Sequence, residues 1–149
     1  MHERLGWTDI LETVSGDAQI LIVDDDLRIR ESLEKLLNSF GYSVKKAASA
    51  EEADAWFTSQ PFDLVILDVE MPRMNGVEFL RWVQKRDKEV AVIMVTGIDD
   101  PTVALECLEA GARTYLVKPI MGNFLRVAVR DALAVRRILV ERNDLRQGL

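Results

Sequence analysis

Residues 64–68 read LVILD, a run of four apolar residues that ends at a single aspartate. A short run that is apolar throughout is typical of a strand that other elements cover on both faces. We predict that this run belongs to a strand from Phe62 to Leu67. Four more short strands are predicted, at residues 19–23 (QILIV), 42–47 (YSVKKA), 90–95 (VAVIMV) and 114–117 (TYLV).

Amphipathic helices are predicted between these strands and after the last one, because apolar residues recur there at helical spacing. Ser49 and Glu52 form an S-x-x-E capping box, which is typical of the first turn of a helix. Asp99 or Asp100 followed by Pro101 is the cap-then-proline pattern that opens another helix. The other expected bounds are residues 29–40, 76–85, 101–110 and, for the last helix, from Leu125 past Leu139.

Apolar strands that alternate with amphipathic helices predict a parallel sheet with helices on both faces, since each strand must cross over a helix to lie parallel to its neighbour. We therefore expect a doubly wound α/β domain. In such domains, ligands bind beyond the carboxyl ends of the strands, where the strand order reverses. The residues that follow the predicted strands are thus the candidates for a functional site.

Five polar residues stand at these strand ends: Asp24 and Asp25 after the first strand, Asp68 after the third, Thr96 after the fourth and Lys118 after the fifth. Three carboxylates in one cleft repel one another unless a cation neutralises them, which indicates a bound hard ion. Oxygen ligands without His or Cys favour Mg2+ over Zn2+. Mg2+ bound by few protein ligands leaves coordination positions for phosphate oxygens, so the site is expected to take a phosphoryl group.

A carboxylate can attack phosphorus and form an aspartyl phosphate. Asp68 is the expected nucleophile, since it stands alone at the end of a central strand, whereas Asp24 and Asp25 form a pair suited to metal binding. Lys118 would pair with one phosphoryl oxygen and the Thr96 hydroxyl with another. The sequence has no G-x-x-x-x-G-K-[ST] motif, so nucleotide binding of the P-loop kind is not expected.

Each of these residues also has a purely structural interpretation. An aspartate after a strand is often a helix N-cap, and Asp26 alone could fill that role. Taken singly, Thr96 is a strand-end hydroxyl and Lys118 a solvated surface lysine. All five candidates together, each at the functional end of its strand, favour the functional interpretation.

The composition indicates one globular domain, with 149 residues, 48% apolar content and a formal charge of -6. The lone Cys107 cannot form an internal disulfide, no run of about 18 apolar residues is present, and the first ten residues lack a signal-peptide core. A cytoplasmic protein is therefore expected. The 25 acidic residues outnumber the 19 basic ones, and no aromatic residue is interleaved with the arginines of residues 126–146, so direct binding to nucleic acid is not expected, nor is binding to a membrane.

Four motifs include these strand ends: ILIVDDD (20–26), LVILDVEMPRMNG (64–76), VIMVTG (92–97) and GARTYLVKP (111–119). Together they resemble the receiver domain of bacterial two-component response regulators, and the resemblance spans residues 19–135. The resemblance implies the flavodoxin-like receiver fold with strand order 2-1-3-4-5. It also implies that a histidine kinase or a phosphotransfer protein supplies the phosphoryl group to Asp68, and that the domain is no enzyme beyond catalysing its own phosphorylation and dephosphorylation.

The resemblance implies a set of metal ligands as well. Mg2+ would be bound by Asp25, Asp68 and the backbone carbonyl of Glu70. Asp24 would act mainly through water.

A conformational switch is a further implication of the resemblance. Thr96 would be coupled to Tyr115, whose ring turns inward when Thr96 is drawn toward the phosphoryl group. The helix at residues 101–110, the fifth strand and the last helix would then form the surface for a partner or for a homodimer.

The two ends of the sequence extend beyond a minimal receiver domain. Residues 1–18 are expected to be an N-terminal extension, in which LGWTDILETV is either a short amphipathic helix or a segment without fixed structure. Residues 136–149 continue the last helix, with Leu139, Leu145 and Leu149 in a loose apolar stripe. They are expected to be a helix extension or the start of a linker to an output domain that the sequence does not show.

Two rival functions use similar residues. A phosphatase of the haloacid dehalogenase type needs a second aspartate two residues after its nucleophile, where this chain has Glu70, and its nucleophile lies on the first strand of the motif. A receiver-like module that dimerises without phosphorylation usually lacks one of the acidic residues, the threonine or the lysine, and none is missing here. The only histidine is His2, so the phosphoryl donor is expected to be another protein.

Overall fold

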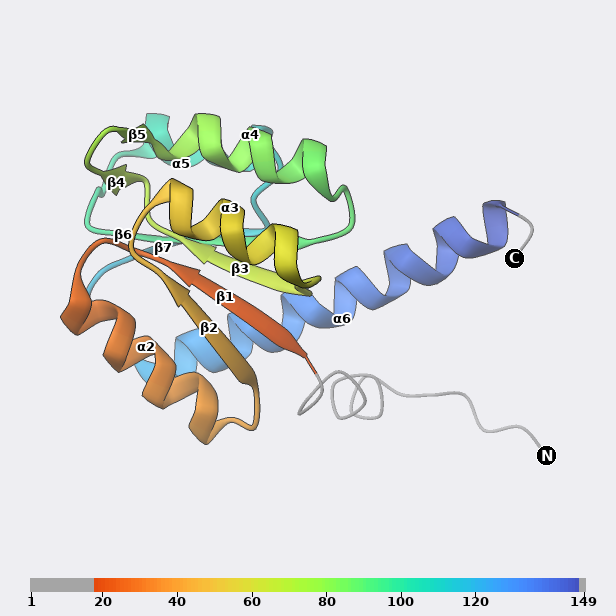
Figure 1. Ribbon diagram of the computed structural model, residues 1–149, viewed down its shortest axis with the longest axis horizontal. Coiled ribbons are helices and arrows are strands. Elements are labelled where there is room, and N and C mark those ends of the chain that lie inside the picture. Colours follow the sequence, from red (N-terminus) through yellow and green to blue (C-terminus); the bar gives the residue numbers. More distant parts are fainter. Residues whose placement is uncertain (1–17, 148–149) are drawn as a thin grey trace.

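A five-stranded parallel sheet forms the centre of the computed structural model, which describes residues 18–147 (Figure 1). The strands lie in the order β2-β1-β3-β6-β7, and every neighbouring pair is parallel. Because β6 and β7 are the fourth and fifth strands of this sheet along the chain, the predicted order 2-1-3-4-5 is confirmed. The strands are β1 (Gln19–Val23), β2 (Ser43–Ala47), β3 (Leu64–Leu67), β6 (Ala91–Thr96) and β7 (Thr114–Val117).

Helices cover both faces of the sheet, which confirms the doubly wound α/β fold. α2 and α6 pack on one face, whereas α3, α4 and α5 pack on the other (Figure 1). No helix within residues 18–147 is both long enough and apolar enough to cross a membrane. The helices are α2 (Leu27–Ser39), α3 (Ala50–Ser59), α4 (Gly76–Arg86), α5 (Pro101–Glu109) and α6 (Gly122–Arg146).

The apolar runs form strands because both of their faces are buried. In β3, Leu64 and Ile66 face the cluster beneath α2 and α6, while Val65 and Leu67 face the cluster beneath α3, α4 and α5. None of these four side chains is more than 1% exposed. Burial on both faces removes most apolar surface from water and explains why polar residues are excluded until the strand ends.

The predicted helix caps are present in the structure. The side chain of Ser49 accepts a hydrogen bond from the backbone N–H of Glu52 at the start of α3, and Asp100 caps α5 just before Pro101. Asp26 caps α2 by accepting from the two N–H groups of Arg28 and Ile29. Asp24 and Asp25 are thereby left free of the capping role.

The structure also differs from the predicted elements in detail. β4 (Glu70–Met71) and β5 (Met74–Asn75) pair as a two-stranded antiparallel hairpin next to Asp68, where no strand was predicted from the sequence. Arg73, at the turn of this hairpin, has a positive φ of 62°. Strands of two residues are too short to show a periodic pattern, so the sequence carried no signal for them.

The helix α6 is continuous across residues 135 and 136, where the receiver domain was expected to give way to an extension. Figure 1 shows it running along one face of the sheet and projecting beyond it. The predicted N-terminal extension lies outside the described residues except for Ala18, whose main-chain carbonyl accepts a hydrogen bond from Ser43. Residues 148–149 also lie outside the described part of the chain.

Candidate functional site

The carboxyl edge of the sheet gathers the residues that the sequence placed at strand ends. Asp24 follows β1 directly, Asp68 follows β3, Thr96 is the last residue of β6, and Lys118 follows β7. Four of the five parallel strands therefore place a polar residue at the same edge. The first strand delivers Asp25 as well.

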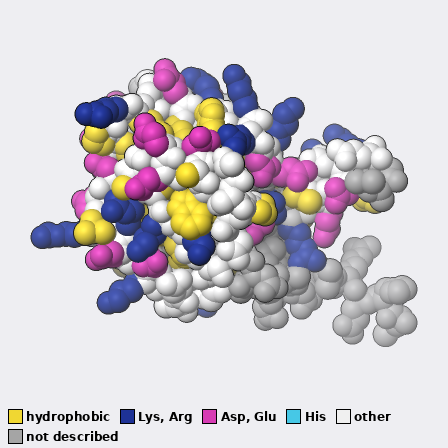
Figure 2. All heavy atoms as spheres, in the orientation of Figure 1, with side chains coloured by type: hydrophobic (Ala, Val, Ile, Leu, Met, Phe, Trp, Pro, Cys, Tyr) yellow, Lys and Arg dark blue, Asp and Glu magenta, His cyan; other side chains and the backbone are white. Residues whose placement is uncertain are grey.

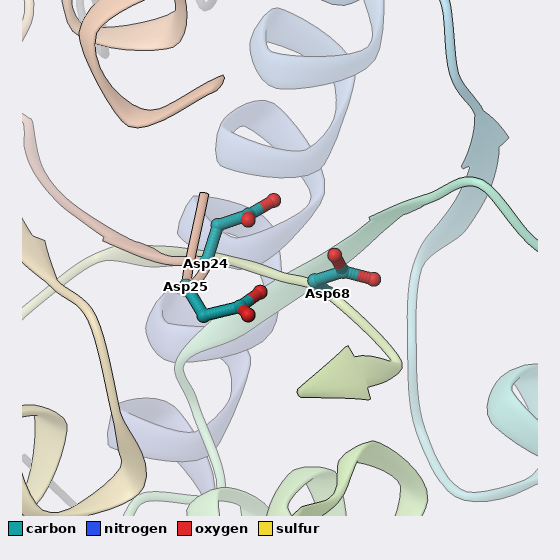
Figure 3. A group of neighbouring side chains, drawn as sticks. All are labelled: Asp24, Asp25 and Asp68. Carbon is teal, nitrogen blue, oxygen red and sulfur yellow. The ribbon is translucent and has the colours of Figure 1, made fainter. Parts of the chain in front are cut away.

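Asp24, Asp25 and Asp68 form an acidic cluster. One oxygen atom of each carboxylate lies within 4.8 Å of the others, and Figure 3 shows Asp24 and Asp25 projecting from one loop on the side on which Asp68 lies. Asp24 is 2% exposed and Asp68 is 5% exposed, whereas Asp25 is open to solvent. Two of the three carboxylates are therefore buried, and the third is in contact with solvent.

Lys118 neutralises part of this negative charge. Its Nζ atom donates to Asp24 Oδ2 at 2.7 Å and to Asp68 Oδ2 at 3.0 Å. Burial alone would lower the pKa of Lys118, but the hydrogen bonds to both aspartates raise it above its usual value. Burial raises the pKa of Asp24, and the bond from Lys118 offsets only part of that effect.

The second oxygen of each buried carboxylate is fixed by its own loop. Asp24 Oδ1 accepts from the backbone N–H of Asp26 at 2.9 Å, and Asp68 Oδ1 accepts from the N–H of Glu70 at 2.9 Å. Both carboxylates are therefore held at two points, by a local turn and by Lys118. Because both side chains are already held in place, they need to move little when a ligand binds.

An open cleft of about 610 Å3 lies over the acidic cluster. It is large enough for a hydrated ion together with a phosphoryl group, and acidic side chains dominate its polar lining. The lining residues are Asp24, Asp25, Asp26, Asp68, Glu70, Met71, Pro72, Gly97 and Lys118.

Thr96 and Tyr115 lie behind the cleft and are connected through one residue. Thr96 is fully buried, and its Oγ1 accepts from the backbone N–H of Ile98 at 3.3 Å. The hydroxyl of Tyr115 donates to the main-chain carbonyl of Ile98 at 2.6 Å. Burial raises the pKa of Tyr115, so this hydroxyl keeps its proton at neutral pH. The two residues of the predicted switch therefore both hydrogen-bond to Ile98, Thr96 to its N–H and Tyr115 to its carbonyl group.

Two residues near the cleft were not singled out in the sequence. Gly76 is packed so closely that a Cβ built on it would lie 2.5 Å from the Cα of Val69, in the loop that follows Asp68. Arg30, on α2, donates from Nη1 to the main-chain carbonyl of Asp24 at 2.7 Å. Gly76 is the last residue of the motif LVILDVEMPRMNG, so the sequence did contain a signal for it. In the sequence, Arg30 looks like any exposed arginine of an amphipathic helix.

Comparison with known families gives a consistent match. The model of the family described as response regulator receiver domain matches residues 20–130. Among solved structures, a CheY-like response regulator receiver domain protein from Methanospirillum hungatei has a TM-score of 0.77 at 34% identity, over 80% of this chain and 96% of that one.

Curated relatives include longer proteins. The C4-dicarboxylate transport transcriptional regulatory protein DctD of Pseudomonas aeruginosa is 34% identical over 134 residues, which is 90% of this chain and 29% of that protein. Response regulator MprA of Mycolicibacterium vanbaalenii is 37% identical over 130 residues, or 87% of this chain and 53% of that protein. The chain thus spans less than a third of DctD and about half of MprA.

Proposed function

The chain belongs to the response regulator receiver domain family, and we propose that it accepts a phosphoryl group on Asp68 from a histidine kinase or a phosphotransfer protein. The observation that carries this proposal is the position of Lys118, whose ammonium group bridges Asp24 and Asp68 at the edge of an acidic cluster. This arrangement combines a carboxylate nucleophile, a charge that can pair with a phosphoryl oxygen, and a set of metal ligands.

The donor set fits Mg2+. The three carboxylates supply hard oxygen atoms within 4.8 Å of one another, and no His or Cys among residues 18–147 lines the cleft. We propose that Asp25, Asp68 and the backbone carbonyl of Glu70 hold the ion, with Asp24 acting mainly through water. When bound, Mg2+ supplies positive charge that stabilises the transferring phosphoryl oxygens.

Asp68 is the proposed nucleophile. One of its oxygen atoms attacks phosphorus while the bond from phosphorus to the donor nitrogen breaks, and the electron pair of that bond stays on the donor histidine. The ammonium group of Lys118 is already within 3.0 Å of Asp68 and can pair with a phosphoryl oxygen as charge moves there. The chain turns over no separate substrate in this scheme.

The signal is proposed to leave the site through Thr96 and Tyr115. A phosphoryl oxygen offers the Thr96 hydroxyl a new acceptor, and movement of Thr96 alters the loop at Ile98 that the Tyr115 hydroxyl holds. The surface that responds consists of α5, β7 and α6. It exposes two leucines of α5, Leu105 at 56% and Leu108 at 45%, which suit a partner protein or a second copy of the chain.

We further infer that the described residues act in the cytoplasm and do not bind nucleic acid directly. Figure 2 shows Lys and Arg side chains interspersed with Asp and Glu over the face it presents, rather than a basic surface. A mixed surface offers little attraction to a polyanion. Any output resembling the transcriptional regulation named for DctD would require residues beyond those that match this chain.

Phosphorylation can be tested by intact-mass spectrometry after incubation with Mg2+ and acetyl phosphate. The expected result is the gain of one phosphoryl group, which chelation of Mg2+ prevents. Binding of Mg2+ without any mass gain would contradict the proposal and favour a dimerisation module. Sustained hydrolysis of a phosphate monoester, in place of acetyl phosphate, would favour a phosphatase instead.

A further inference from the structure

Arg30 holds the loop that carries two of the acidic residues. Its Nη1 atom donates to the main-chain carbonyl of Asp24 at 2.7 Å, and the arginine is half-buried near the start of α2. We infer that Arg30 is a positioning residue for the metal site, which it serves by fixing the peptide group between Asp24 and Asp25. This inference rests on the proposed function, because it assigns Mg2+ to the acidic cluster.

Asp25 depends on this contact more than Asp24 does. Asp24 is also held by its N–H, which donates to the carbonyl of Ala47, and by both of its carboxylate oxygens. Within residues 18–147, in contrast, Asp25 makes no hydrogen bond or ion pair, and its side chain is exposed. The peptide unit is planar, so a fixed Asp24 carbonyl also fixes the direction in which the chain enters Asp25. Arg30 therefore orients a ligand that it does not touch.

The positive charge of Arg30 weakens the binding of a cation, whereas its positioning role strengthens it. A guanidinium group next to the acidic cluster repels Mg2+, so removal of its charge alone would strengthen Mg2+ binding. Loss of positioning would weaken binding, because residues that orient metal ligands typically contribute about tenfold or more to metal affinity. The two effects differ in sign, and the sign of the measured change separates them.

The test is calorimetric titration of the full chain with Mg2+ alone. We expect Arg30→Met to bind Mg2+ about tenfold more weakly than the wild type. Arg28→Met is the matched control, since Arg28 lies on the same helix, is exposed, and makes no side-chain hydrogen bond or ion pair within the described residues. Its affinity for Mg2+ is expected to be unchanged or slightly higher.

Arg30→Lys keeps the positive charge and an N–H donor, but on a shorter side chain. Positioning predicts that it binds Mg2+ more tightly than Arg30→Met, whereas an effect of charge alone predicts the reverse order. If Arg30→Met fails to fold, Arg30→Lys is compared with the wild type instead: its shorter side chain predicts weaker Mg2+ binding if Arg30 acts by positioning, whereas an effect of charge alone predicts equal binding. In the absence of Mg2+, amide spectra of Arg30→Met should change at Asp25 and Asp26 but not in the sheet, with a melting temperature close to that of the wild type.

Equal or tighter Mg2+ binding by Arg30→Met would overturn the inference, as would an equal loss in Arg28→Met or absence of Mg2+ binding by the wild type. The titration contains no phosphodonor. If the wild type binds Mg2+ but is not phosphorylated, the proposed function fails while the expected result for Arg30→Met still supports its positioning role.

Discussion

The hydroxyl of Tyr115 donates a 2.6 Å hydrogen bond to the main-chain carbonyl of Ile98. The N–H of the same residue donates to Thr96 Oγ1, so Ile98 is held from both sides. A shift of Thr96 toward the cleft would weaken one of these bonds and change the geometry of the other. The structure thus contains a short connection from the edge of the acidic cluster to β7.

Thr96→Ala should still be phosphorylated at Asp68 but should lose the coupling between phosphorylation and binding of a partner or a second copy. The coupling is expected to be about 1–3 kcal/mol, or roughly a 5- to 150-fold change in affinity. Thr58→Ala, which removes a hydroxyl of α3 outside the site, should behave as the wild type. Amide spectra of the wild type with beryllofluoride would contradict this route if changes were confined to the Asp68 loop and Tyr115 and α6 were silent.

Asp25→Ala should bind Mg2+ more weakly, while the stability of the metal-free protein should be unchanged or improved because one like charge is removed from the cluster. Asp26→Ala is the matched variant. It removes the N-cap of α2 and should lower the free energy of unfolding by about 1 kcal/mol. Chemical denaturation and Mg2+ titration of both variants check this. Wild-type Mg2+ affinity together with a large loss of stability in Asp25→Ala would identify it as structural.

Asp24→Asn should be more favourable to the stability of the metal-free protein at pH 7 than at acidic pH. Burial raises the pKa of Asp24 above its usual value of 3.8, so between that value and the higher folded value the native state binds more protons than the unfolded state. The contribution of Asp24 to stability therefore falls as pH rises through this window. The advantage of Asn should shrink as pH is lowered through the same window. An advantage that grows on acidification would contradict this assignment.

Gly76→Ala should lower the free energy of unfolding by roughly 1–3 kcal/mol, because the new Cβ would lie 2.5 Å from the Cα of Val69 and one backbone segment must move. The same shift should displace the loop after Asp68 and slow the phosphorylation of Asp68. Gly97→Ala is the control for stability, since its Cβ would meet only Glu70, at 3.8 Å. Denaturant titration of both variants decides the point, and equal stabilities would show that the loop relaxes freely.

Strong local patterns made much of the fold predictable. The run LVIL before Asp68 and the cap-then-proline pattern at Asp100 and Pro101 are signals contained within a few residues, and the structure has the expected elements there. The general rule for parallel sheets then places Asp68 and Lys118 at one edge. Their ion pair links residues 50 positions apart, yet the rule anticipated their proximity.

Features that depend on tertiary packing could not be predicted in this way. The bond from Arg30 to the Asp24 carbonyl depends on how α2 leaves β1, and no sequence pattern distinguishes Arg30 from the exposed Arg28. The bond between Tyr115 and Ile98 depends on where the loop after β6 passes over β7. The roles of the site residues in metal binding and phosphorylation stay predictions that require the experiments above.

The central claim is that Asp68 itself carries the phosphoryl group, and chemical trapping tests it most directly. Borohydride reduces an aspartyl phosphate, but not a free carboxylate, to the alcohol homoserine, which peptide mass spectrometry can locate. After treatment with Mg2+ and acetyl phosphate, we predict homoserine at position 68 of the wild type, and none in Asp68→Asn or in a sample without phosphodonor. Homoserine at another aspartate with position 68 unmodified, or none at all in a wild type that binds Mg2+, would contradict the account.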